Sequence, residues 1–286
     1  MITATDSIES VFIDANGLRF DVDVCGSGER FALLLHGFPE HKFSWRFQLP
    51  MLARLGYTAW APNLRGYGQS ARPTGVQAYA IEHLIDDVAA LIDAAAARGI
   101  TGPTTLIAHD FGAVIAWTFA LRRVRPLERF IVMNFPHPAL FLRHMAGWRQ
   151  LGRSWYMFFA LIPRLPEKLL LMHDARAIGE SFRGMAIDKS RFPEEVLEIY
   201  RANARQPGAM TAMINYYRAA MRNRRLRASW RDAPTLETPT LMLWGEQDSS
   251  LGKELTYGTQ ERVLNRPAFR RHSGTALRIT RLELYR

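Results

Sequence analysis

The chain has 286 residues, of which 48% are hydrophobic, 22% charged and 11% aromatic. This composition supplies apolar side chains for one large core or two small ones and excludes an intrinsically disordered protein. The single cysteine, Cys25, excludes a disulfide framework and any cysteine-based metal site, and it fits a reducing compartment. The N-terminus lacks the pattern of a signal peptide, and no run of about 18 apolar residues exists, so we expect a cytoplasmic protein that does not span a membrane.

The formal net charge is +10, which by itself suggests an anionic partner. Much of the excess lies in residues 139–233, which hold 17 Lys and Arg against 8 Asp and Glu. No RNP, KH or zinc-finger pattern organises these charges, so we expect a solvated basic face and no nucleic-acid partner. The sequence does not indicate an oligomeric state.

The first 138 residues alternate between strand and helix patterns. Residues Val11–Val24 predict a hairpin around the Asn16-Gly17 turn. Residues Ile81–Ala97 have helical spacing and end before Gly99. Short apolar runs, typical of parallel strands buried on both faces, lie at Phe31–Leu35, Tyr57–Ala61, Thr105–Ala108 and Phe130–Met133. The alternation predicts an α/β protein with a mostly parallel sheet flanked by helices.

The pattern changes after Pro138. Residues 139–233 contain helical stretches rich in aromatic residues, Met and Arg, but no strand-like run. A strand pattern returns at Pro239–Trp244. We therefore expect a core of residues 1–138 and 234–286, interrupted by an all-helical cap of residues 139–233.

A candidate nucleophile follows the predicted strand Thr105–Ala108. The strand runs into a helix, Ala113–Leu121, through a small-x-Asp-x-small sequence in which Ala108 and Gly112 flank Asp110. This is the nucleophile-elbow pattern, with aspartate in place of serine, and no G-x-S-x-G occurs elsewhere. The pattern favours a carboxylate nucleophile over serine-type acyl transfer. The alternative is an aspartate that only caps the helix.

A second segment, His36-Gly37-Phe38-Pro39-Glu40, follows the strand Phe31–Leu35. In hydrolases of this plan, one backbone N–H from this loop and one from the residue after the nucleophile form an oxyanion hole. Here the donors would be Phe38 and Phe111. The alternative, a simple turn, is reasonable for this segment alone but not for both segments in this order.

With these segments in place, the sequence resembles the epoxide-hydrolase branch of the α/β-hydrolase superfamily over roughly residues 10 to 264. The resemblance implies an α/β-hydrolase fold with an inserted helical cap. It also implies hydrolysis of a small apolar epoxide to a vicinal diol, with no metal and no organic cofactor. The matching segments are HGFPE (36–40), NLRGYGQSARP (63–73), HDFGA (109–113), NFPHP (134–138), INYYR (214–218) and LWGEQD (243–248).

The resemblance also implies roles for individual residues. Asp110 would attack an epoxide carbon and form an alkyl-enzyme ester. Tyr156 and Tyr217 would hydrogen-bond the epoxide oxygen as it becomes an alkoxide, with Tyr216 as the second choice. Asp248 would orient the catalytic histidine. The alternative position for this acid holds Asn134, which cannot supply the charge, and substrate contacts are expected from Pro39 and Trp155.

The C-terminal segment departs from the family pattern. Leu277-Arg278 stands where the catalytic histidine and a tryptophan are expected, and His272 is the only histidine after Asp248. The residues before His272 are also poor in apolar side chains. These features predict a truncated or frameshifted C-terminus, in which the ester forms but is not hydrolysed. The alternative is that His272 reaches the site from a reshaped loop and acts as the base.

Four alternatives stand beside epoxide hydrolysis. A haloalkane dehalogenase uses the same Asp elbow, but many place Trp beside the nucleophile to hold the halide, and Phe111 has no N–H to offer. Haloacid-type relatives carry arginines just after the nucleophile, which are absent here. A hydrolytically dead remnant would bind or alkylate once. Residues Trp155–Ile162 could also rest on anionic lipid, although such a stretch more often lines the substrate tunnel.

Overall fold

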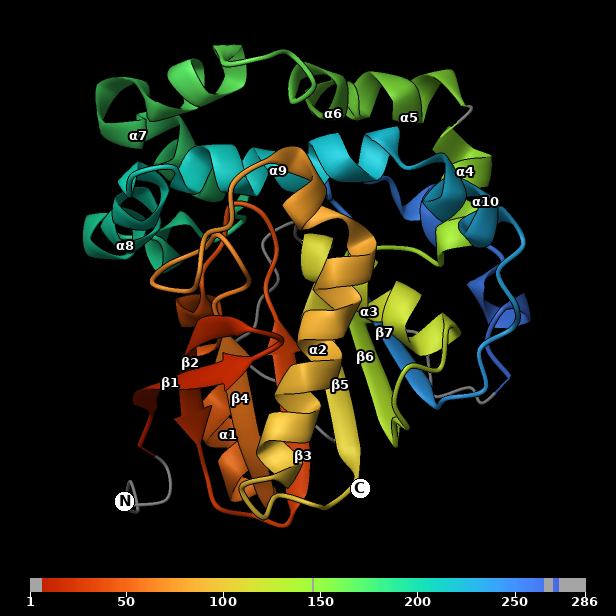
Figure 1. The fold of residues 1–286 in the computed structure, drawn as a ribbon. Coiled ribbons are helices and arrows are strands. Elements are labelled where there is room, and N and C mark those ends of the chain that lie inside the picture. Colours follow the sequence, from red (N-terminus) through yellow and green to blue (C-terminus); the bar gives the residue numbers. More distant parts are fainter. Residues whose placement is uncertain (1–6, 146, 265–269, 273–286) are drawn as a thin grey trace.

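The computed structural model describes residues 7–145, 147–264 and 270–272. In these ranges eight strands form one sheet in the order β1-β2-β4-β3-β5-β6-β7-β8 (Figure 1). The strands are β1 (Glu9–Ala15), β2 (Leu18–Cys25), β3 (Arg30–Leu35), β4 (Tyr57–Pro62), β5 (Thr104–His109), β6 (Arg129–Met133), β7 (Thr240–Gly245) and β8 (Arg270–His272). Strand β2 pairs antiparallel with β1 and β4, and all other pairs are parallel. The predicted hairpin and mostly parallel sheet are confirmed.

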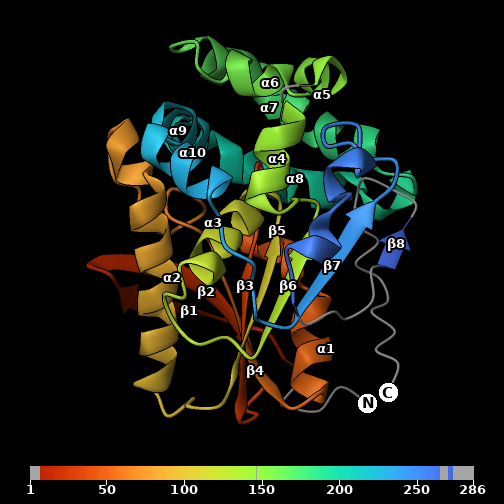
Figure 2. The ribbon, with the colours of Figure 1, turned by 90° about the vertical axis from the view of Figure 1, so that its right-hand side faces the viewer.

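Helices cover both faces of this sheet. Helix α1 (Gln48–Arg54) lies on one face, while α2 (Ile81–Ala96) and α3 (Asp110–Leu121) lie on the other (Figure 2). Helix α2 is amphipathic, whereas α3 is apolar all round and is buried over almost its whole length. The predicted helix Ala113–Leu121 begins earlier than expected, at Asp110, because the nucleophile candidate itself opens the first turn.

Within the described residues, seven further α-helices follow β6 and form what we term the helical layer. They lie above the sheet in Figure 1, across the edge where β5 passes into α3. Helix α7 is kinked at Met172–Ala175, where three residues take left-handed φ values. The helices are α4 (Pro138–Met145), α5 (Trp148–Arg153), α6 (Trp155–Phe159), α7 (Leu165–Met185), α8 (Glu194–Arg205), α9 (Ala209–Arg222) and α10 (Arg224–Arg231).

The loop that follows β4 joins the sheet to the helical layer. The N–H of Gly68 donates a 2.7 Å hydrogen bond to Oδ1 of Asn203 on α8. The hydroxyl of Tyr216 on α9 donates one of 2.8 Å to the carbonyl of Arg65. At Gly66, an added Cβ would lie 2.7 Å from the Cβ of Ala212 on α9, so the close approach requires glycine. The NLRGYGQSARP segment (63–73) thus connects the sheet to the helical layer through hydrogen bonds and close packing.

The end of the chain is only partly described. Strand β8 pairs parallel with β7, with His272 opposite Gly245. A strand forms here although its residues are Arg-Arg-His, because backbone pairing with β7 does not depend on apolar side chains. Leu277, Arg278 and the rest of the predicted defect lie outside the described residues. Within the described residues, the structure contains no helix of the length and hydropathy needed to cross a bilayer.

A buried ion pair holds the loop that follows β4 against helix α2. Nε and Nη2 of Arg65 donate to Asp87 of α2 at 2.6 and 2.5 Å, and both residues are buried. Replacing Asp87 with alanine strands a buried guanidinium, so Asp87→Ala should lower the free energy of unfolding by about 3–5 kcal/mol in urea denaturation.

The matched control is Asp86→Ala, which removes the neighbouring exposed carboxylate of the same helix. It should change the free energy of unfolding by no more than about 0.5 kcal/mol. Equal effects of the two substitutions would contradict the assignment of Arg65–Asp87 as a structural pair.

Candidate active site

Asp110 sits in a tight turn between β5 and α3, with a φ of 49°. Two glycines let the backbone close around it. A Cβ on Gly37 would lie 2.4 Å from the Cβ of Asp110, and a Cβ on Gly112 would lie 2.5 Å from carbonyl oxygens of the β3 end. Any side chain at either position would therefore push the turn apart. The strained strand–turn–helix geometry is that of a nucleophile elbow.

The carboxylate of Asp110 is partly buried and meets both predicted backbone donors. The N–H of Phe38 donates to Oδ1 at 2.8 Å, and the N–H of Phe111 also donates to the carboxylate. Burial raises the pKa of Asp110 above its ordinary value, while the charge of His109 and these two N–H groups act in the opposite direction. The two donors therefore hold the carboxylate in one orientation.

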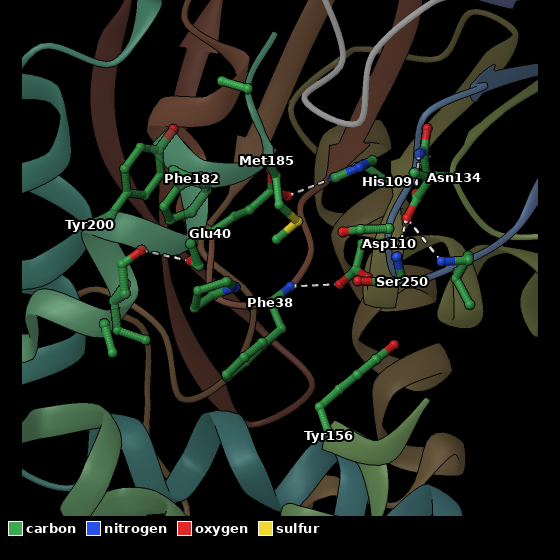
Figure 3. Close-up of a pocket in the computed structure, with 18 of the residues that line it drawn as sticks. Phe38, Glu40, His109, Asp110, Asn134, Tyr156, Phe182, Met185, Tyr200 and Ser250 are labelled. Carbon is green, nitrogen blue, oxygen red and sulfur yellow. Dashed lines mark hydrogen bonds and ion pairs between the residues drawn. The ribbon is translucent and has the colours of Figure 1, made fainter. Parts of the chain in front are cut away.

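A charged pair formed by His109 and Glu40 lies beside Asp110. Nδ1 of His109 lies 3.0 Å from Oε2 of Glu40, which also accepts the N–H of Gly37 at 2.6 Å (Figure 3). Burial lowers the pKa of His109, but the charges of Glu40 and Asp110 outweigh burial and raise it to about 9. The same pair lowers the pKa of Glu40 against the effect of its burial. An imidazolium therefore stands next to Asp110 at neutral pH.

Asp248 follows β7 and is also held by several donors. Oδ1 accepts the N–H groups of Ser250 and Leu251, both at 2.8 Å. Oδ2 accepts the amide of Asn134 at 2.5 Å. Asn134 directly follows β6, and its own oxygen accepts the N–H of Gly245 at 3.3 Å. Asn134, at the alternative acid position, thus orients Asp248 and does not itself supply a charge.

Two tyrosines reach the site from the helical layer. Tyr156 lies on α6, with its hydroxyl pointing toward Asp110 (Figure 3), and Tyr217 lies on α9. Burial raises the pKa of both, and the charge of Asp110 raises it further, so both hydroxyls stay protonated. Within the described residues neither hydroxyl has a hydrogen-bond partner. Tyr216 differs, because its hydroxyl donates to Arg65 and it does not line the cavity.

These groups line one cavity of about 830 Å³. Phe111 is buried beneath it and offers only its backbone N–H. The backbone of His272 lies at the end of β8, beside Gly245, but its side chain lies outside the described residues. Within the described part of the chain, no cluster of His, Cys, Asp or Glu side chains could hold a metal ion. The sequence-predicted residues that line the cavity are Phe38, Pro39, Asp110, Trp155, Tyr156, Tyr217 and Asp248.

Comparison with known proteins places this geometry in a family. The sequence profile of the alpha/beta hydrolase fold matches residues 33–271. Epoxide hydrolase 4 of Mus musculus is 36% identical over 264 residues, which cover 89% of this chain and 70% of that protein. The chain belongs to the epoxide-hydrolase branch of the α/β-hydrolase superfamily. The predicted α/β-hydrolase fold is therefore confirmed, and the chain is an α/β-hydrolase enzyme.

Two further relatives agree with this assignment. The AB hydrolase superfamily protein YfhM of Bacillus subtilis is 32% identical over 263 residues, covering 91% of this chain and 88% of that protein. The crystal structure of an epoxide hydrolase from Vigna radiata superposes with a TM-score of 0.75 at 27% identity, covering 94% of this chain and 92% of that one.

Sequence reasoning gave no role in the site to Glu40 or His109, and it named Asn134 only as an alternative acid position that lacks the charge. All three lie within segments that match the family, yet a motif does not show which side chains meet. Glu40 and His109 are 69 positions apart and come together only because β3 and β5 are neighbours. A prediction of this contact would have needed the order of the strands in the sheet, because the loops at the carboxyl ends of adjacent parallel strands lie side by side.

The ion pair between Glu40 and His109 predicts a shifted histidine titration. The stabilisation that depends on the charge of His109 is complete below about pH 6.5 and is lost as pH rises through about 9. Glu40→Gln removes the counter-charge, so the pKa of His109 should fall to 6.5 or below in an NMR titration of the ring. Glu246→Gln, at an exposed acid, is the control and should leave it near 9. An unshifted His109 in Glu40→Gln would refute the pairing.

Proposed function

We propose that this enzyme hydrolyses epoxides to vicinal diols through an ester on Asp110. The observation that carries the proposal is one cavity that the Asp110 carboxylate shares with Tyr156 and Tyr217, whose hydroxyls have no protein partner within the described residues. The names of the relatives from Mus musculus and Vigna radiata support an epoxide substrate. In this proposal residues 139–233 act as a cap on a core of residues 1–138 and 234–286.

The first half-reaction forms the ester. The N–H of Phe38 binds Oδ1 of Asp110, and in this proposal the other carboxylate oxygen attacks an oxirane carbon. As the new C–O bond forms, the ring C–O bond breaks and its electron pair moves onto the epoxide oxygen. Tyr156 and Tyr217 donate hydrogen bonds to this oxygen, and one of them supplies the proton. Their raised pKa values suit this task because the hydroxyls are protonated before the reaction.

The second half-reaction hydrolyses the ester. A water attacks the carboxyl carbon of Asp110, and a histidine takes its proton. We assign this role to His272, with Asp248 holding its imidazole. Strand β8 supports the assignment, because it brings the backbone of His272 opposite Gly245, three residues before Asp248. The N–H groups of Phe38 and Phe111 then bind the oxyanion of the tetrahedral intermediate. When the intermediate collapses, the bond between the carboxyl carbon and the alkyl oxygen breaks, the alkyl oxygen takes the proton from the imidazolium, and the diol leaves. The proton of the restored Asp110 carboxyl returns to the tyrosinate.

The roles proposed for the two tyrosines predict that ester formation slows when either hydroxyl is removed. Tyr156→Phe and Tyr217→Phe should each slow ester formation by about 10- to 100-fold, because a hydrogen bond to a developing oxyanion contributes about 1.5–3 kcal/mol. Rapid quench of styrene oxide reactions followed by intact mass spectrometry gives this rate.

Tyr216→Phe is the matched control for the tyrosine series. It loses a structural hydrogen bond to Arg65, so it should lower stability and leave the rate of ester formation unchanged. If Tyr216→Phe slowed the reaction as much as Tyr217→Phe, the assignment would be wrong. Halide release from chloroalkanes at rates matching epoxide turnover would favour a dehalogenase instead.

The histidine role predicts a trapped intermediate. Ester formation needs no base, so His272→Ala should form the ester at the normal rate and stall at hydrolysis. Intact mass spectrometry should show the protein heavier by one substrate, and Asp110→Ala should show no adduct. His173→Ala, at an exposed histidine of α7, is the control and should turn over normally.

The other outcomes separate the remaining possibilities. Multiple turnover that persists in His272→Ala would exclude His272 as the base. Accumulation of the ester in the unaltered chain, with turnover restored by Leu277→His, would instead identify position 277 as the empty base position of a protein that alkylates only once.

A further inference from the structure

The outer side of the helical layer carries a patch of exposed apolar side chains. Helices α5 and α6 lie at the top of the molecule in both ribbon views, on the side away from the sheet (Figures 1 and 2). Five large apolar side chains from α5, α6 and the start of α7 are each 41 to 46% exposed, whereas a surface helix ordinarily presents polar side chains to solvent. We term these five residues the outer patch: Leu151, Phe158, Ile162, Leu165 and Leu169.

The cavity does not account for the outer patch. Tyr156, Phe159 and Leu170 line the cavity from the same helices, but none of the five patch residues lines it. Their exposure is therefore to solvent on the outside of the molecule. On α7, Leu165 and Leu169 are four residues apart and share one face of the helix. Helices α6 and α7 thus carry apolar side chains on two sides, one facing the cavity and one facing outward.

The exposed charges among the patch residues are positive. Arg164 and Lys168 are exposed, and within the described residues neither has a carboxylate partner. Glu167, the acid between them, is largely buried and pairs with Arg218 of α9 at 2.6 Å. Residues 158–169 therefore combine exposed apolar side chains with exposed positive charges and no exposed negative charge, which is complementary to an apolar, anionic partner.

The position of Lys168 favours a lipid surface over a protein as this partner. Lys168 lies between Leu165 and Leu169, among the apolar side chains. The buried centres of protein interfaces are depleted of lysine. At a bilayer, the aliphatic stem of a lysine lies along the apolar region while its ammonium group stays among the headgroups. Trp155, which lines the cavity and is 63% exposed, belongs to a residue type enriched at membrane interfaces.

A second copy of the chain is a poorer match for the outer patch. In a two-fold symmetric contact the same residues of both copies meet. Arg164 and Lys168 of one copy would then approach the same cations of the other, and residues 158–169 expose no carboxylate that would compensate them. An anionic bilayer supplies the opposite charge, which strengthens binding by about fivefold for each basic residue near its surface.

We propose that the outer patch docks on an anionic lipid surface. The apolar side chains of the patch enter the boundary between headgroups and acyl chains, and Arg164 and Lys168 contact the anionic headgroups. The excess of basic residues in 139–233 adds a longer-range attraction. Helix α6 carries both Phe158 of the patch and Tyr156 of the cavity, so docking brings the cavity close to the bilayer. The docking does not depend on the reaction proposed above.

The test is flotation of the full chain with lipid vesicles, and the readout is the lipid concentration that gives half-maximal flotation. Vesicles of phosphatidylserine and phosphatidylcholine in equal parts should bind the chain at least about tenfold more tightly than phosphatidylcholine alone, and added salt should release it. Arg164→Gln and Lys168→Gln should each weaken binding about fivefold, whereas Lys168→Arg should keep it. Phe158→Gln and Leu169→Gln should each weaken binding about tenfold, because each removes buried apolar area and inserts an amide.

Matched controls make the same changes outside the outer patch. Arg225→Gln removes an exposed basic residue of α10, and Leu55→Gln replaces an exposed leucine that follows α1. Both should float like the unaltered chain. A second measurement uses Trp155, whose fluorescence should be quenched by brominated lipid in the same vesicles. The quenched part of the total fluorescence should therefore fall in Trp155→Phe.

Three results would overturn the inference. The first is a chain that does not float with anionic vesicles. The second is an equal loss of binding in Arg225→Gln and Lys168→Gln, or quenching that is unchanged in Trp155→Phe, because the bilayer would then meet no defined face or another face of the molecule. The third is a dimer, seen by sedimentation without lipid, that Leu169→Gln dissociates, because the outer patch would then bind a second copy of the chain.

Discussion

The carboxylate of Asp110 lies partly buried just after strand β5, and burial of a charge is costly unless it is paired and hydrogen-bonded. The structure compensates it with the N–H groups of Phe38 and Phe111 and with the imidazolium of His109. Each compensating group depends on a close backbone approach. That approach is possible only because residue 37 is glycine, since a Cβ there would overlap Asp110.

The helical layer must also be held in a fixed place, because it contributes the two tyrosines. Arg218 on α9 achieves this for α6. Its guanidinium donates to the carbonyls of Ala160 and Ile162, just after α6, and to both carboxylate oxygens of Glu167 on α7. The side chain next to Tyr217 therefore anchors the helix that carries Tyr156. Their rings are 6.1 Å apart, so the two hydroxyl donors are positioned by one local network.

How much of this could be predicted from the sequence depended on whether a feature is local. The elbow at Asp110 and the loop at Phe38 are local patterns set by a few glycines and a buried strand, and both lie where the pattern indicated. The choice of Tyr217 over Tyr216 came only from the resemblance, and the structure distinguishes them by the engagement of Tyr216 with Arg65. The links from Glu40 to His109 and from Asn134 to Asp248 join separate strands, so spacing along the chain could not identify them.

In the proposed chemistry, the same backbone N–H donors oppose the first step and favour the second. When Asp110 attacks, its negative charge decreases, so the N–H groups of Phe38 and Phe111 stabilise the starting carboxylate more than the transition state. The charge appears instead on the epoxide oxygen, where only the tyrosines can meet it. When the ester is hydrolysed, charge returns to the carbonyl oxygen of Asp110, and the same N–H groups now favour the transition state. A site with an oxyanion hole alone would therefore slow its own first step, and the tyrosines of the helical layer offset this cost.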